Sequence, residues 1–242
     1  MAIYPLVVAL IALVFGGIVL RQWLTRKRPQ QLLWSVSLFM AALAALVYVA
    51  FLSTGADLIF RVYYIFGALL NAAYLGMGSL YLVLSRRVAN LVLSGLVIVS
   101  AFGVALLVVA PLDPTKLHEA QLQGLSGAGV IKQGLWLVLF ILHNVFGALT
   151  VSGVAVYSAY KVGKQQAPRR FAVANITIAA GVLIVSQAGS GARLGAPSGL
   201  FWIITAAGFS VVFVGFLLTA ALPIFVGRGR AAQTGEAPPA SA

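Results

Sequence analysis

The chain has 242 residues, of which 62% are hydrophobic and only 8% are charged. A soluble domain carries about 25% charged residues, so the charges here are too few to cover a surface that faces water. Cysteine is absent, which excludes a disulfide-stapled secreted domain. A net charge of +12 would suggest nucleic acid in a soluble protein, but in a membrane protein basic residues set orientation. The composition therefore predicts a polytopic membrane protein with no nucleic-acid partner.

Seven segments are long and apolar enough to cross a bilayer, since a transmembrane helix needs about 20 mostly apolar residues. The alternating ten-residue pattern of membrane strands is absent. The sequence therefore predicts an all-α integral membrane protein, a seven-transmembrane helix bundle over 1–227, and a disordered cytoplasmic tail over 228–242. The predicted spans are 3–20, 32–52, 62–84, 91–110, 135–160, 171–189 and 199–222, with an outer loop at 111–134.

The basic residues fall mainly in alternate connections. Twelve of the 16 Lys and Arg residues follow spans one, three and five or lie in the tail, and four lie on the other side. Because Lys and Arg are retained in the cytoplasm, this split predicts an N-terminus outside and a C-terminus inside. We therefore expect a multi-pass protein of the cytoplasmic (plasma) membrane. Its basic face is expected to contact anionic lipid, at about 1 kcal/mol per residue near the surface.

The outer loop divides the chain into three spans, one linking span and three spans. Such layouts occur in transporters built from parallel repeats, but the triplets share little residue identity, and the common demands of membrane insertion explain the pattern as well. Within the loop, Asp113 before Pro114 predicts an N-capped surface helix that ends at Gly124. In the third span, Ala68, Ala72 and Gly76 form a row of small residues that favours close approach of another helix.

No Asp or Glu lies inside a predicted span, which argues against proton pumping through a membrane-embedded carboxylate. The neutral polar residues fall at two depths, roughly 9–14 Å and roughly 20 Å below the outer surface by helical rise. They either form hydrogen bonds between helices or line a ligand pocket that opens outward. The candidate ligand-binding residues are Asn71, His143, Asn144 and Thr205 at the outer level, with Thr150 and Asn175 deeper. A candidate outer mouth, which surface solvation explains equally well, comprises Asp57, Arg61, Gln187 and Arg193.

The chain offers little for a cofactor. Its two histidines, His118 and His143, lie in the outer loop and well inside a span, so they cannot hold a haem or a metal together. There is no thiolate ligand, the seventh span has no lysine for a retinal Schiff base, and the GxSxG motif of hydrolases is absent. We therefore expect no cofactor, no metal and no catalytic residue, which favours a protein that is not an enzyme.

Three functional hypotheses follow from these observations. The first is a protein that binds or passes a small molecule through an outer-half polar pocket, as a transporter does. The second is a non-catalytic structural or accessory subunit that packs against a membrane protein partner or forms a homo-oligomer, because small-residue faces are abundant. The third is a membrane sensor, which would need a separate signalling partner because the chain carries no signalling domain.

Overall fold

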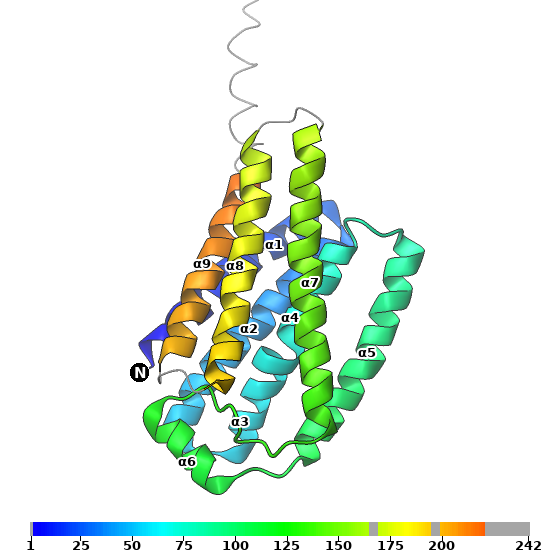
Figure 1. Cartoon of the computed structure of the whole chain (residues 1–242). Helices are drawn as coiled ribbons and strands as arrows, with labels where there is room; N and C mark the ends of the chain where they lie inside the picture. The colour runs from blue at the N-terminus through cyan, green and yellow to red at the C-terminus, as the bar shows by residue number, and fades with distance from the viewer. Residues whose placement is uncertain (1, 165–168, 195–198, 221–242) are drawn as a thin grey trace, which may run out of the picture.

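The computed structural model describes residues 2–164, 169–194 and 199–220. Within these residues seven helices are long and apolar enough to cross a membrane, and no strand is present. The predicted seven-helix bundle is therefore confirmed (Figure 1). Its elements are α1 (Ile3–Arg26), α2 (Pro29–Thr54), α3 (Asp57–Tyr63), the π-helix η1 (Tyr64–Leu70), α4 (Asn71–Leu80), α5 (Arg86–Val109), α6 (Pro114–Gln123), α7 (Leu135–Lys164), α8 (Arg169–Arg193) and α9 (Leu200–Ala220).

Several helices are longer than the predicted spans. Helix α1 continues to Arg26, α5 begins at Arg86 and α7 continues to Lys164, because long basic side chains let a helix extend past its apolar stretch while the charges reach water. The third span instead begins earlier, at Asp57, and ends at Leu80, since 81–84 form a turn. The end of the seventh predicted span and the predicted tail at 228–242 lie outside the described residues.

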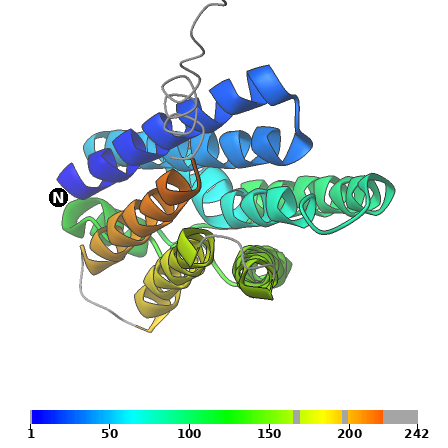
Figure 2. The ribbon, with the colours of Figure 1, turned by 90° about the horizontal axis from the view of Figure 1, so that it is seen from above.

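Six of the seven membrane spans form a closed ring, in which the third span takes part through its segment α4 (Figure 2). Around it, α1 packs on α2, α2 on α4, α4 on α7, α7 on α8, α8 on α9, and α9 on α1. Helix α5 lies outside this ring, against η1, α4 and α7. Exchanging the triplet α1–α2–α4 with the triplet α7–α8–α9 leaves the order of contacts unchanged.

The two ends of the bundle differ in charge. One end, called here the α6 end, carries α6 and the first residues of α1, α7 and α9 (Figure 1). The other, called here the basic end, carries ten basic residues of the described chain. These are Arg21, Arg26, Lys27, Arg28, Arg86, Arg87, Lys161, Lys164, Arg169 and Arg170. The α6 end carries four, namely Arg61, Lys116, Lys132 and Arg193.

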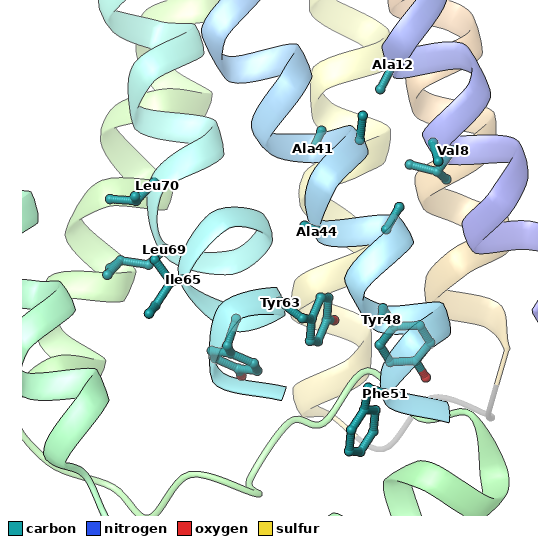
Figure 3. Packing of buried hydrophobic residues seen from close by; sticks show 14 of the residues in the cluster. Val8, Ala12, Ala41, Ala44, Tyr48, Phe51, Tyr63, Ile65, Leu69 and Leu70 are labelled. Atoms are coloured by element: carbon teal, nitrogen blue, oxygen red, sulfur yellow. The ribbon is translucent and has the colours of Figure 1, made fainter. Parts of the chain in front are cut away.

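The segment around α6 is fastened over its end of the ring. As predicted, the Asp113 side chain caps α6 by accepting from the backbone N–H groups of its first turn, and Gly124 ends the helix in a left-handed conformation. The Tyr48 hydroxyl donates to the Leu125 carbonyl oxygen at 2.7 Å, and the Tyr63 hydroxyl donates to that of Ser126 at 3.0 Å. Figure 3 shows both tyrosines in the buried aromatic cluster beneath this segment.

Close helix crossings depend on small residues, as the row in the third span predicts. A side chain added at Gly147 of α7 would collide with the Ala72 carbonyl oxygen, and one added at Gly76 would collide with Thr150. Helices α8 and α9 approach in the same way, because a side chain at Gly215 would meet the Ala174 carbonyl oxygen at 2.9 Å. These contacts hold neighbours in the ring together by close packing.

Candidate functional site

A cavity of about 390 Å³ lies at the centre of the ring. It is lined by α1, α2, the third span, α7, α8 and α9, and among the described residues none of its walls comes from α5. Two residues of the segment after α6, Ser126 and Ala128, also line it. Ligand pockets commonly measure about 300–1,000 Å³, so the cavity is large enough for a small molecule.

Small side chains on α2 and η1 help to keep this space open. Ala41, Ala44 and Ala45 of α2 line the cavity, together with Gly67 of η1. Figure 3 shows Ala41 and Ala44 on the same helix as Tyr48. A side chain at Gly67 would place its Cβ 2.9 Å from that of Ala44, so larger residues here would both clash and fill the cavity.

Four of the ten predicted site residues line the cavity: Asn71, Asn144, Thr205 and Arg193. The Asn144 amide donates at 2.8 Å to the carbonyl oxygens of Ala68 and Phe140. The Ser37 hydroxyl donates to Asn71, at 2.8 Å from both its Oδ1 and its carbonyl oxygen. Within the described chain, the Asn71 amide N–H groups and the Asn144 Oδ1 have no protein partner. One donor group and one acceptor atom are therefore available to a ligand.

Asn71 and Asn144 lie beside the π-helix η1, whose backbone needs hydrogen-bond partners from neighbouring helices. A π-helix is rare and often occurs at functional sites. Irregular backbone at membrane depth needs partners from neighbouring helices or a cavity beside it. Asn144 of α7 bonds the carbonyl oxygen of Ala68 inside η1, and Ser37 of α2 bonds Asn71 directly after it. The sequence left two roles open for the polar residues, hydrogen bonding between helices and lining a pocket. Asn71 and Asn144 do both.

His143 faces α5 rather than the cavity. It is buried, with its Nδ1 2.7 Å from the Leu139 carbonyl oxygen and its Nε2 3.0 Å from the Ser100 hydroxyl. Because a carbonyl oxygen only accepts, Nδ1 carries the hydrogen and Nε2 accepts from Ser100. His143 therefore joins α5 to α7, and the pocket role predicted for it has no support in its geometry.

The other predicted residues also lie away from the cavity walls in the described structure. Thr150 donates to the Phe146 carbonyl oxygen at 2.6 Å and packs against Gly76, while Asn175 donates at 2.8 Å to the Phe171 carbonyl oxygen of its own helix. The Arg61 guanidinium donates at 2.7 Å to the Leu107 carbonyl oxygen, which ties α3 to the end of α5. Asp57 and Gln187 are exposed.

Arg193 lies at the α6 end of the cavity, at the end of α8, where it both lines the cavity and is exposed. Its guanidinium is centred 4.5 Å from the Phe140 ring, a favourable cation–π arrangement. None of the described carboxylates, Asp57, Asp113 and Glu119, forms a salt bridge with it. This end of the cavity therefore carries an uncompensated positive charge.

Trp202 is a site residue that the sequence did not single out. It lines the cavity, is only 4% exposed, and its indole N–H has no hydrogen-bond partner among the described residues. The Tyr48 ring lies beside it, with 4.6 Å between the ring centroids, and the Tyr48 hydroxyl donates to the Leu125 carbonyl oxygen. In a sequence, a Trp near the end of a span indicates an anchor at the membrane interface, so nothing there distinguished it.

The cavity reaches the outside of the bundle between α7 and α8. Ile141 and Val145 of α7 line the cavity although they are 49% and 48% exposed, and Ser190 of α8 both lines it and is exposed. Figure 1 shows that α7 and α8 diverge toward the α6 end. The opening thus faces sideways, away from the axis of the ring.

In the part of the chain that the structure describes, no group of three His, Cys, Asp or Glu residues is placed to hold a metal ion. The described geometry instead combines an apolar cavity with two asparagines, one arginine and one unpaired indole N–H. Comparisons with protein-family models, with curated proteins and with solved structures found no match to this chain. The functional conclusion therefore rests on the cavity itself.

Proposed function

We propose that this protein binds a small molecule in the central cavity while its seven helices cross a membrane. The single observation that supports this most is the cavity of about 390 Å³ enclosed by six helices. In lipid, helices associate by packing against one another, so a space of this size forgoes contacts at the centre of the bundle. A ligand that fills the space would supply them.

The polar groups of the cavity support binding over a purely structural role. The Asn71 amide and the Asn144 Oδ1 retain hydrogen-bonding capacity beside the cavity. Both residues are half-buried, and a ligand with a matching acceptor or donor could form hydrogen bonds with these groups. A few convergent polar groups in a mostly apolar pocket are typical of small-molecule sites.

We also propose that the basic end lies in the cytoplasm and the α6 end outside, across the cytoplasmic membrane. The support is the distribution of charge, with ten basic residues at one end of the described chain and four at the other. Lys and Arg in short connections are retained on the cytoplasmic side. Asn144, Thr205 and Arg193 of the cavity wall lie toward the α6 end of their helices, so the cavity would then open toward the outer leaflet.

Filling the cavity tests the binding proposal. Ala148 of α7 lines the cavity, whereas the next residue, Leu149, is 68% exposed on the outside of the bundle. Native mass spectrometry of the purified wild-type protein is expected to show a bound molecule that Ala148→Phe loses and Leu149→Phe retains. Thermal unfolding of both variants checks that the fold persists.

Two results would contradict the binding proposal. One is a wild-type protein that carries no bound mass in any gentle detergent. The other is bound mass that Ala148→Phe leaves unchanged, because the molecule would then lie elsewhere. A co-purifying protein subunit without a bound small molecule would instead support the accessory-subunit alternative.

A further inference from the structure

We infer that the ligand of the central cavity is a single-chain anionic amphiphile that enters sideways from the bilayer, with its charged group near Arg193 and its apolar chain along the cavity. This inference rests on the proposed binding function. It goes further by naming the chemical class of the ligand, the residue that selects its charge and the route of entry.

The deeper part of the cavity is suited to an apolar chain. Its walls there include Phe15, Leu38, Phe209 and Val212, and Asn71, which accepts from Ser37, is a polar residue at the level of Leu38. The hydroxyl of Ser186, which also lines it, donates to a carbonyl oxygen of its own helix at 2.9 Å. From Leu200 at the α6 end to Val212, the helical rise spans about 18 Å. The chain of an amphiphile would bury apolar surface along this length.

The volume favours one chain over two. At about 390 Å³ the cavity is near the lower limit of common ligand pockets. A phospholipid with two acyl chains would leave most of its mass outside. A fatty acid or another molecule with a single chain therefore fits the space better.

The α6 end of the cavity is suited to an anion. The Arg193 guanidinium has no carboxylate partner in the described structure, and the Trp202 indole N–H, at the same end, has no acceptor. Both groups donate hydrogen bonds and neither accepts one. A carboxylate or a phosphate brings several acceptor oxygens and a charge opposite to that of Arg193, whereas an amine would be repelled.

The opening between α7 and α8 gives the ligand a route from the bilayer into the cavity. Ile141 and Val145 line this opening and are about half exposed, and Ser190 and Arg193 lie across from them on α8. In a membrane the outer surface of these helices faces acyl chains. An amphiphile already inserted in the bilayer can pass its chain through an apolar slot without exposing it to water.

Quenching of Trp202 fluorescence tests the inference. The protein is a full-length variant in which Trp23, Trp34 and Trp136 are replaced by Phe, so that Trp202 is the single tryptophan. It is reconstituted in phosphatidylcholine vesicles. The probes are a bromine-labelled fatty acid, the corresponding alcohol and the corresponding amine, because bromine quenches only on contact. The acid is expected to quench saturably and to bind about tenfold more tightly than the alcohol, as loss of a charged hydrogen bond predicts.

Matched variants identify the selecting residue. Arg193→Gln is expected to remove the preference for the acid over the alcohol. Lys132→Gln removes the same charge at the same end, from an exposed residue that is not among the described cavity walls, and is expected to leave the preference intact. A control variant in which Trp23 is the single tryptophan reports the quenching that is caused by probe dissolved in the bilayer. If the multiple Trp substitutions unfold the protein, native mass spectrometry of the wild type with the same three probes gives the same comparison.

The outcomes separate the inference from the proposed function. Equal saturable binding of acid, alcohol and amine, blocked by Ala148→Phe, would overturn the anionic ligand but keep the cavity as a binding site. Equal quenching by a brominated two-chain phosphatidylglycerol would overturn the single-chain ligand. Quenching that never exceeds the Trp23 control, with no effect of Ala148→Phe, would overturn both.

Discussion

His143 and Asn144 are neighbours on α7 with different structural roles. Asn144 lies toward η1 and the cavity, while His143 lies toward α5 and accepts a hydrogen bond from Ser100. Adjacent residues on a helix lie about 100° apart around its axis. Asn144 therefore faces the interior of the ring, whereas His143 faces α5 outside the ring. Residue type and depth alone do not separate the two roles.

The bond between Ser100 and His143 is expected to stabilise the attachment of α5. Ser100→Ala should lower the free energy of unfolding by about 0.6 kcal/mol, the average for hydrogen bonds between membrane helices, and by no more than about 1.7 kcal/mol. Ser94→Ala, on the same helix, should have almost no effect because that hydroxyl bonds only its own helix, at the Asn90 carbonyl oxygen. Unfolding in mixed micelles measures both. Equal effects of the two substitutions would contradict the role given to His143.

The third membrane span is not one uniform helix. It passes from α3 through η1 to α4, and the π-helical turn lies beside the cavity. The sequence Tyr64–Leu70 is apolar and has no proline, so it reads as ordinary α-helix. Asn144 and Ser37, from two other helices, bond the backbone at and after this turn and so help to stabilise it.

Removing the Asn144 amide should therefore destabilise the π-helical turn. Asn144→Ala is expected to cost about 1 kcal/mol of unfolding free energy, because the Ala68 carbonyl oxygen loses a partner from another helix. Asn175→Ala is the matched control, since Asn175 bonds only the carbonyl oxygen four residues earlier in its own helix. Equilibrium unfolding compares them. A cost for Asn175→Ala as large as that for Asn144→Ala would refute the assignment.

At the scale of the whole molecule, the triplets α1–α2–α4 and α7–α8–α9 form a ring whose two ends differ in the number of basic residues. The linking helix α5 brings the chain back to the α6 end, so that α7 starts at the same end as α1 (Figure 1). Both triplets therefore run in the same direction, and the cavity lies where they meet.

The proposed orientation gives a simple prediction, because the chain contains no cysteine. Thr115→Cys places one thiol at an exposed position on α6, and Thr25→Cys places one at an exposed position near the basic end. In intact cells, a membrane-impermeant maleimide should label the first variant and not the second, whereas both should be labelled after the cells are opened. The reverse pattern would invert the proposed topology.

The sequence by itself determined the number of spans, their approximate limits and the asymmetry of charge. Bilayer thickness sets the length of an apolar helix, and a run such as Leu32–Leu52 shows this without any knowledge of its neighbours. The sequence also singled out Asn71, Asn144 and Thr205, because polar groups are costly in an apolar span and stand out for that reason. It placed Arg193 in the outer mouth.

Only the tertiary structure decided which face of each helix meets the cavity. Lipid and the protein interior are both apolar, so a membrane helix has no polar side that marks its outer face. The sequence therefore did not show that His143 faces α5, that Trp202 keeps an unpaired N–H, or that η1 departs from α-helical bonding. Each of these depends on a neighbour distant in the chain, and packing between the two triplets brings such neighbours together around one central space.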